Sequence, residues 1–154
     1  MSITVERKGA VAWITMSAPQ RRNPLTVDFP ARMLAILDEL ESDPDCRVVV
    51  LSAEGTVFCA GADLGAVLHP DGVEAERQYL LVRGFNRVVR RMRELDLPII
   101  AALNGPAVGG GAALALACDF AIATSRADLL FAFGRVGGTS ADMGCTWLLS
   151  RLVG

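Results

Sequence analysis

The chain has 154 residues, of which 52% are hydrophobic and 21% charged, as expected for one globular domain with a substantial core. Its net charge of −2 gives no strongly basic surface, so a nucleic-acid partner is not expected. The amino-terminal residues do not resemble a secretory signal, and we expect a cytoplasmic protein.

The cysteines and the single histidine exclude two further kinds of site. The four cysteines are far apart in the sequence and form no C-x-x-C pair: Cys46, Cys59, Cys118 and Cys145. We therefore expect reduced thiols and no metal site. His69 precedes a Pro-Asp-Gly sequence, which predicts a surface loop.

The first half of the chain begins with a predicted hairpin. Apolar residues alternate on both sides of Lys8-Gly9, over residues 3–16. Thr26 is placed to cap a helix whose apolar residues, from Phe29 to Leu40, fall on one face. The continuous apolar run at 48–51 is typical of a strand buried on both faces of a parallel sheet.

The second half continues the alternation of helices and strands. Apolar residues at helical spacing predict a helix from Tyr79 to Met92, and Pro98 separates it from a buried strand at 99–103. A further strand is predicted at 120–124 and a final helix at 143–152. This order predicts one α/β domain with right-handed crossovers.

One apolar stretch, from Ile99 to Cys118, is as long as a membrane span. Asn104-Gly105-Pro106 and Gly109-Gly110-Gly111 interrupt it, and a helix through these residues would be strongly destabilised. The stretch therefore predicts a buried strand, a glycine turn and a short helix, and no membrane association is expected.

Two loops of small residues, at 57–64 and 104–111, follow the two predicted buried strands and precede helices. Ligands of α/β proteins bind at this end of the strands, and the free N–H groups of a first helical turn favour an anion. A dinucleotide fingerprint is absent because Leu114 stands where its third glycine would fall, and there is no Gly-Lys-Ser/Thr phosphate loop.

The sequences of these loops, Phe58-Cys59-Ala60-Gly61-Ala62-Asp63-Leu64 and Asn104-Gly105-Pro106-Ala107-Val108-Gly109-Gly110-Gly111, resemble the enoyl-CoA hydratase/isomerase (crotonase) family. The resemblance runs from the amino terminus to Gly154. It implies a crotonase-like (ClpP/crotonase) α/β spiral of ββα units and a homo-oligomer, trimeric or hexameric. It also implies that the N–H groups of Ala62 and Gly110 form an oxyanion hole, which binds an acyl-CoA thioester and stabilises its enolate.

The resemblance implies contacts to coenzyme A as well. The implied contact residues are Gln20, Arg21, Arg22, Ala60, Gly61, Ala62, Asp63, Leu64, Gly109 and Gly110. The two arginines suit the phosphates of coenzyme A, although ordinary surface charge is an equal alternative. Coenzyme A is part of the substrate, and no other cofactor and no metal are expected.

The acid–base residues depart from the hydratase pattern. Related hydratases carry two glutamates, but here the first position is Ala113 and the second falls in the segment 131–135, which has no carboxylate. Asp142 remains, and it resembles the aspartate that some isomerases of the family use to move a proton between carbons. Alternatively, Asp142 caps the helix at 143–152. The stretch 136–139 is one residue longer than in related sequences, which would displace Asp142.

Three functions stay open: an isomerase-type enzyme acting through Asp142, a catalytically weak acyl-CoA-binding pseudoenzyme, and half of a split enzyme completed by another chain. Relatives continue into helices that cover the acyl pocket and build the trimer, so residues 1–154 resemble a core domain without that segment. We therefore expect exposed apolar faces on the strands at 48–51 and 99–103 and on the helix at 143–152, and association with a second chain.

Overall fold

The computed structural model describes residues 1–67, 75–137 and 142–154. The strands are β1 (Ser2–Lys8), β2 (Val11–Ser17), β3 (Val48–Ala53), β4 (Ile99–Leu103), β5 (Ala107–Val108), β6 (Phe120–Ala123) and β7 (Leu129–Leu130). The α-helices are α1 (Phe29–Ser42), α2 (Leu64–Val67), α3 (Ala75–Glu94), α4 (Gly110–Ala117) and α5 (Cys145–Val153). Short 3-10 turns are η1 (Pro19–Arg21), η2 (Phe133–Val136) and η3 (Asp142–Gly144). His69 lies outside the described residues, and so does part of the stretch 136–139.

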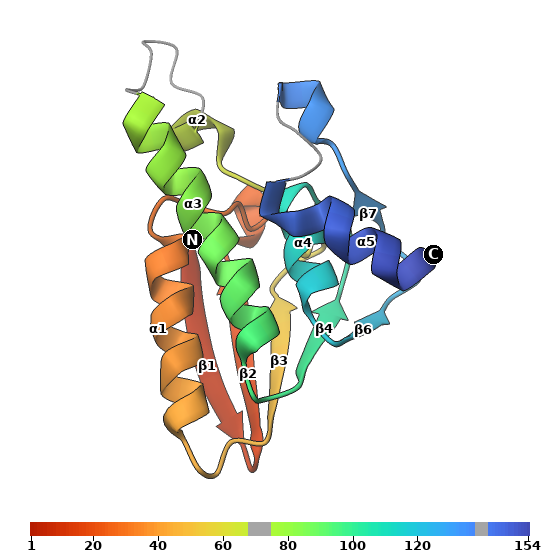
Figure 1. Ribbon diagram of the computed structural model, residues 1–154. Helices are drawn as coiled ribbons and strands as arrows, with labels where there is room; N and C mark the ends of the chain where they lie inside the picture. Colours follow the sequence, from red (N-terminus) through yellow and green to blue (C-terminus); the bar gives the residue numbers. More distant parts are fainter. Residues whose placement is uncertain (68–74, 138–141) are drawn as a thin grey trace.

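The main sheet has the strand order β1-β2-β3-β4-β6 (Figure 1). The predicted hairpin is confirmed, because β1 pairs antiparallel with β2. The remaining neighbours β2, β3, β4 and β6 are all parallel, as the alternation of strands and helices predicts. Strands β5 and β7 form a separate two-stranded parallel sheet. The carboxyl ends of β3 and β4 thus lie at the same edge of the sheet, where both small-residue loops begin.

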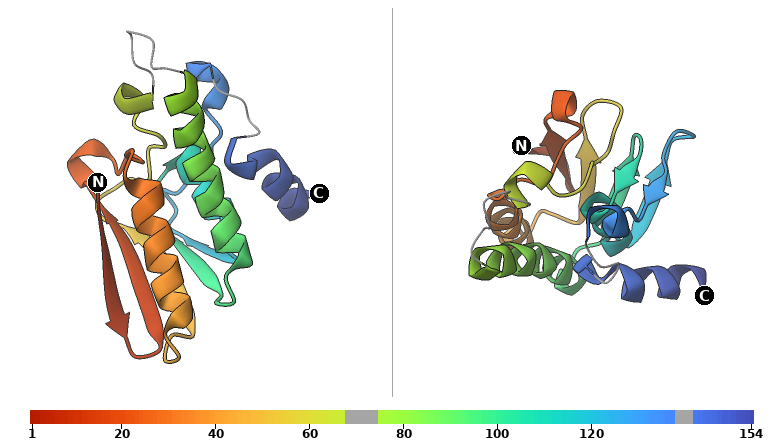
Figure 2. Two further views of the ribbon diagram at one scale, coloured as in Figure 1. Left: turned by 60° about the vertical axis from the view of Figure 1, so that its left-hand side comes forward. Right: turned by 90° about the horizontal axis from the view of Figure 1, so that it is seen from above.

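Helices α1, α3 and α5 lie on one face of the main sheet (Figure 2). The alternation in β2 explains this layer, because Ala12, Ile14 and Met16 are buried while the intervening residues are partly exposed. From the other side, α1 contributes Met33 and Leu37 to the same core. The buried side chains that alternate along β2 and those on one face of α1 therefore pack together in one apolar layer.

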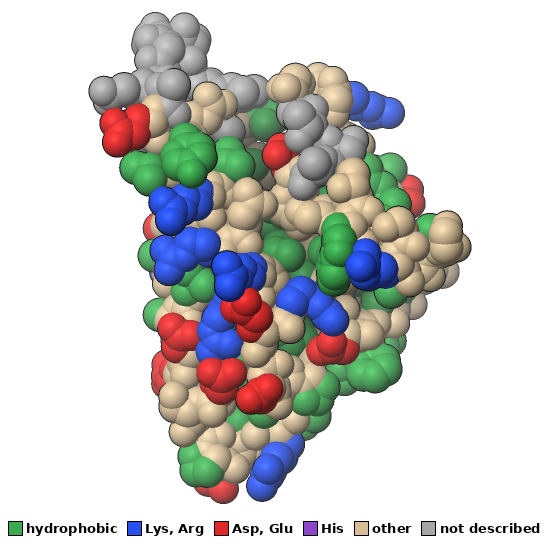
Figure 3. All heavy atoms as spheres, viewed as in Figure 1, with side chains coloured by type: hydrophobic (Ala, Val, Ile, Leu, Met, Phe, Trp, Pro, Cys, Tyr) green, Lys and Arg blue, Asp and Glu red, His purple; other side chains and the backbone are tan. Residues whose placement is uncertain are grey.

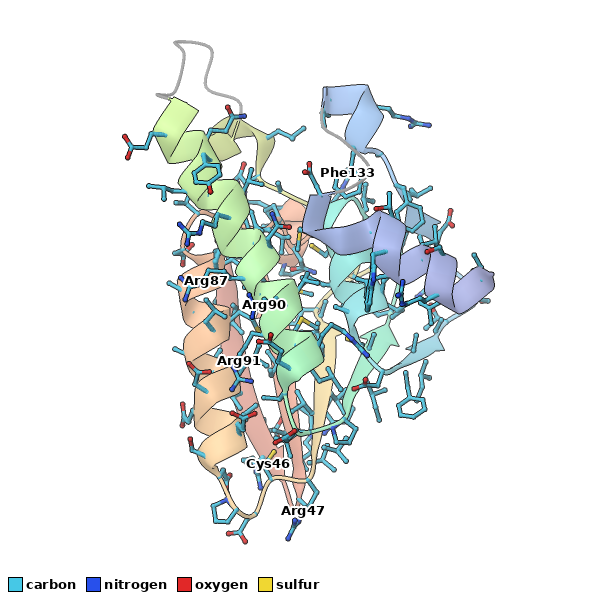
Figure 4. All side chains as sticks on the ribbon, viewed as in Figure 1. Cys46, Arg47, Arg87, Arg90, Arg91 and Phe133 are labelled. Carbon is cyan, nitrogen blue, oxygen red and sulfur yellow. The ribbon has the colours of Figure 1, made fainter. Side chains whose placement is uncertain are left out.

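Charged side chains of both signs cover the outer surface of α1 and α3 (Figure 3). Arg91 of α3 binds two carboxylates of α1, with N···O distances of 2.8 Å to Asp38 and 2.6 Å to Glu41. Arg90 pairs with Glu94 on its own helix at 2.7 Å. Figure 4 labels Arg90 and Arg91 on this surface. The two ion pairs of Arg91 link α3 to α1. Helix α3 also forms part of the cavity described below.

Two helix starts differ from the sequence prediction. Thr26 does not cap α1: the helix begins at Phe29, and its N-cap residue is Asp28, without a side-chain cap bond. The predicted helix at 143–152 is also divided, because Met143 and Gly144 have φ angles of 54° and 73°. Left-handed residues cannot continue a right-handed helix, so α5 starts only at Cys145.

The apolar stretch from Ile99 to Cys118 divides into β4, β5 and α4, as predicted. The eight residues of α4 are all buried, which accounts for their apolar character. Within the described ranges, no helix is long and apolar enough to cross a membrane.

The exposed apolar surface is only partly where the sequence predicts it. The strands at 48–51 and 99–103 consist of buried and half-buried residues, so their predicted exposure is wrong. The exposure is instead at the edge strand β6, where Phe120 and Ile122 are 64% and 68% exposed. The prediction is confirmed for the last helix, where Trp147 and Leu152 are exposed. Figure 3 shows hydrophobic side chains gathered over β6.

Candidate active site

A cavity of about 170 Å³ lies between α3, the two small-residue loops and the turn η3. Its lining is mostly apolar and consists of Ala62, Leu64, Gln78, Val82, Phe85, Gly110, Phe133, Val136, Gly137, Asp142 and Met143. The cavity therefore brings together Ala62, Gly110 and Asp142, which are far apart in the sequence. Of the predicted coenzyme A contacts other than Ala62 and Gly110, only Leu64 lines this cavity.

The two loops are joined by backbone hydrogen bonds. The N–H of Val108 donates to the carbonyl oxygen of Cys59 at 2.8 Å, and the N–H of Phe58 donates to that of Pro106 at 3.0 Å. A second set joins the loop to Leu25, whose N–H donates to the Gly61 oxygen at 2.8 Å and whose oxygen accepts from Asp63 at 3.0 Å. This network fixes the backbone on both sides of Ala62.

The N–H groups of Ala62 and Gly110 have no acceptor among the described residues. Ala62 lies between the bonded groups of Gly61 and Asp63, and Gly110 is the first residue of α4. A Cβ atom placed on Gly110 would lie only 3.9 Å from the Ala62 nitrogen, so the two residues are neighbours at the cavity wall.

Glycine is required at the start of α4 for two separate reasons. Gly109 has φ 51° and ψ −115°, a conformation that a residue with a Cβ atom strongly disfavours. At Gly110 the restriction is space, because a Cβ atom would lie 2.9 Å from Leu25 Cδ1 and 3.0 Å from Met143 Sδ. Without a side chain, Gly110 contributes only backbone atoms to the cavity lining.

Asn23 is a residue of this region that sequence reasoning missed. It is fully buried, and its Oδ1 accepts the Ala18 N–H at 2.7 Å. Its Nδ2 donates to the carbonyl oxygens of Glu54 and Val57, at 2.8 Å and 2.9 Å. Asn23 thereby fixes the segment before Leu25 against the loop that follows β3. Its position before Pro24 is a turn signal that would have pointed to it.

The two segments predicted to contact coenzyme A are adjacent in space. Arg21 Nη2 lies 2.6 Å from Asp63 Oδ2, and the Arg21 side chain is 55% exposed. The Ala60 N–H donates to the Arg22 carbonyl oxygen at 2.9 Å. Gln20 is exposed beside them. Residues 20–22 and 60–64 thus form one continuous surface next to the cavity, in which Arg21 already has an anionic partner.

Asp142 lies at the cavity in the turn η3, and its interpretation as the cap of the last helix is wrong. The N-cap position of α5 is Gly144, two residues later, because Met143 and Gly144 interrupt the helix. The N–H of Met143 donates to Oδ1 of Asn86 on α3 at 2.9 Å. Asn86 is the second residue that sequence reasoning missed, and no local signal identifies it.

Asp142 is the only carboxylate among the described residues that line the cavity. Ala113 is fully buried within α4. The neighbouring thiols are not suited to act as bases or nucleophiles. Burial raises the pKa of Cys59 to about 12, and burial together with the charge of Asp142 raises that of Cys145 to about 11. In the described part of the chain, no three His, Cys, Asp or Glu residues form a metal-binding group.

A parallel α/β sheet with a cavity that two small-residue loops and Asp142 line is the arrangement that the resemblance to the crotonase class implies. A model of the enoyl-CoA hydratase/isomerase family matches residues 6–154, and the chain belongs to this family. It is 40% identical to a putative enoyl-CoA hydratase of Thermus thermophilus over 96% of this chain and 57% of the relative. It is 37% identical to 1,2-epoxyphenylacetyl-CoA isomerase of Escherichia coli over 94% and 55%, respectively.

The fold comparison agrees with the family assignment. A solved enoyl-CoA hydratase from Polaromonas sp. JS666 superposes with a TM-score of 0.92 at 34% identity. The match covers 99% of this chain and 59% of that one. The predicted crotonase-like fold is confirmed, and the chain spans a little over half the length of the relatives that it matches.

Proposed function

We propose that this chain binds an acyl-CoA thioester and stabilises its enolate, and that its chemistry is isomerase-type, with Asp142 as the base. The observation that carries the proposal is the set of residues that line one cavity. Two N–H groups without an acceptor in the described ranges, those of Ala62 and Gly110, belong to residues that line the same cavity as Asp142. An enolate needs donors at its oxygen and a base at its carbon.

The two N–H groups suit a thioester oxygen that becomes negatively charged. Removal of a proton from the carbon next to the carbonyl moves an electron pair onto that oxygen. Each preorganised donor in such a site is worth about 3 kcal/mol, because its bond strengthens as the charge develops. Gly110 opens α4, so the positive end of the helix adds to the stabilisation.

Asp142 can perform both proton transfers of an isomerisation. Its carboxylate takes a proton from C2 of a 3-enoyl-CoA, and the electron pair spreads over the diene and the thioester oxygen. The carboxylic acid then returns the proton to C4, which leaves a 2-enoyl-CoA and restores the carboxylate. One carboxylate suffices, and neither a metal nor a redox cofactor takes part in these steps.

Hydration is the less favoured reaction of this cavity. It requires a positioned water and proton transfers at two centres, which two carboxylates normally share. Asp142 is the only carboxylate found on the described lining, and the position of a first hydratase glutamate is the buried Ala113.

We further propose that coenzyme A lies over the surface formed by residues 20–22 and 60–64. Gln20 and Arg22 offer polar and cationic groups there, and Arg21 would exchange its partner Asp63 for a phosphate. The exposed apolar residues of β6 and α5 favour a homo-oligomer or a complementing chain in the functional form.

The test is proton exchange in deuterated water with a panel of 3-enoyl-CoA thioesters. The wild type should introduce deuterium at C2 and C4 and form the 2-enoyl isomer, as mass spectrometry would show. Binding of the thioester without exchange would indicate a pseudoenzyme, and exchange only after addition of a second chain would indicate a split enzyme. Efficient hydration of 2-enoyl-CoA by the wild type would contradict the isomerase preference.

A further inference from the structure

The turn that carries Asp142 has a backbone conformation that it cannot maintain by itself. Met143 has φ 54°, although it carries a Cβ atom, and Gly144 follows with φ 73°. A left-handed residue other than glycine is disfavoured by about 1–2 kcal/mol and persists only where its surroundings hold it. The conformation of η3 must therefore be fixed by contacts from other elements.

Within the described part of the chain, Met143 makes two such contacts, and they are of different kinds. On one side, Oδ1 of Asn86 accepts the N–H of Met143 at 2.9 Å. On the other side, the Met143 side chain is 5% exposed and its Sδ lies against Gly110. The turn is thus attached to α3 by one directional hydrogen bond and to α4 by packing.

The bond from Asn86 acts one residue away from Asp142. A hydrogen bond to the Met143 N–H fixes the orientation of the peptide unit between Asp142 and Met143, since that N–H belongs to it. This orientation determines where the Asp142 side chain leaves the backbone. Packing of Met143 alone does not restrict rotation of the peptide unit in the same way.

We propose that Asn86 is a positioning residue, which holds the carboxylate of Asp142 at its distance from the N–H groups of Ala62 and Gly110. The inference rests on the proposed function of Asp142. Asn86 does not line the cavity, so it acts through Met143 and not on the substrate. Displacement of a catalytic group by about 1 Å can cost two orders of magnitude in rate.

Two variants separate positioning from support of the fold. Asn86→Leu keeps the size of the side chain but removes the acceptor, and it should lower kcat for proton exchange about 10- to 100-fold with KM nearly unchanged. Its melting temperature should fall by only about 2–5 °C, as expected for one hydrogen bond. Arg87→Ala, at the adjacent exposed position of α3, is the control and should behave as the wild type.

Asn86→Asp restores the acceptor and adds a charge. It should recover most of kcat, and it should shift the acidic limb of the kcat profile upward. The added negative charge disfavours the ionised form of the neighbouring carboxyl group, so a higher pH is needed to form the base. The shifted limb measures how close residue 86 lies to the base, and loss of kcat in Asn86→Leu beside a small loss of stability identifies the positioning role. Amide hydrogen exchange of Met143 should be slow in the wild type and in Asn86→Asp, and fast in Asn86→Leu.

The outcomes are distinguishable from those of the proposed function. Full kcat in Asn86→Leu, together with loss of exchange in Asp142→Asn, would overturn the positioning role and leave the base in place. Equal losses in stability and in kcat for Asn86→Leu and Asn86→Asp, without a shifted pH limb, would assign Asn86 to the fold alone. Full exchange in Asp142→Asn would overturn the proposed function, and the inference with it.

Discussion

The two halves of the cavity wall are held in different ways. The amide wall, formed by the backbone at Ala62 and Gly110, is fixed by hydrogen bonds between residues 58–63, Leu25 and residues 106–109. In the carboxylate wall, formed by Asp142–Gly144, Met143 is held by a hydrogen bond from its N–H to the Asn86 side chain and by packing against Gly110. The amide wall is therefore a property of the fold, whereas the carboxylate wall is a property of a few side chains.

This difference bears on the range of reactions that such a fold can support. Backbone donors stabilise an oxyanion whatever reaction forms it. The side chains that move protons can change without disturbing those donors. The two relatives compared above carry the names of a hydratase and an isomerase, so relatives of this chain are named for more than one reaction.

The largest effect should come from the carboxylate wall. Asp142→Asn removes the base and keeps the shape, so we expect exchange to fall by about 10²–10⁴-fold, the usual contribution of a general base. Binding of the thioester should stay unchanged, because the amide wall is intact. Exchange kinetics and calorimetric titration would measure the two quantities. Unchanged exchange would show that the proton acceptor is another group.

Distortion of the amide wall should have the next largest effect. A Cβ atom at Gly111 would lie 2.6 Å from both Cβ and O of Cys59, so Gly111→Ala must displace the loop that carries Ala62. We expect about a 100-fold loss of kcat and about 1–3 kcal/mol of destabilisation. Gly134→Ala is the matched control, because a Cβ atom there meets nothing within 4 Å. Similar behaviour of both variants would contradict the rigidity of this wall.

Asn23 tests the support behind the amide wall. Asn23→Ala leaves the Ala18 N–H and the carbonyl oxygens of Glu54 and Val57 without their partner in a buried place. We expect a loss of about 2–4 kcal/mol in the free energy of unfolding, measured by urea denaturation. Arg90→Ala, which removes an exposed ion pair, should cause no measurable change. If Asn23→Ala lowered the free energy of unfolding by less than Arg90→Ala does, the loop would keep its conformation without Asn23.

An effect that is absent at neutral pH concerns the thiols. Burial raises the pKa of Cys59 and Cys118 to about 12, above the value of about 8.5 for an unfolded thiol. Above pH 9 or so the unfolded chain loses these protons while the folded chain keeps them, so stability should fall as pH rises, by about 1.4 kcal/mol per unit for each thiol. Below that pH both thiols are protonated in the folded and in the unfolded chain, so they contribute nothing to the pH dependence of stability.

Urea denaturation at a series of pH values would measure this slope. Cys118→Ala should remove one thiol's share of it, and Cys59 should resist alkylation of the folded protein near pH 8. Rapid alkylation of Cys59 under native conditions would show that the loop below the amide wall opens readily. That result would also weaken the contrast between the two walls.

The sequence by itself determined the elements and the family. The hairpin, the strands at 48–51 and 99–103 and the helices before and after them follow from apolar periodicity, which is a local property. The two loops were identified by their small residues and by their places after buried strands. A site built from backbone N–H groups needs no particular side chain. A run of glycines and alanines in the sequence can therefore indicate its position.

Only the tertiary structure decided how Asp142 is placed. The division of the last helix depends on the left-handed Met143, whose conformation is held by Asn86, 57 residues earlier in the chain. Asn23 likewise binds residues 31 and 34 positions away. The exposure of β6 follows from its place at the edge of the sheet. Such contacts produce no periodic pattern in the sequence, because a single polar side chain reaches its partner only after the strands and helices have packed.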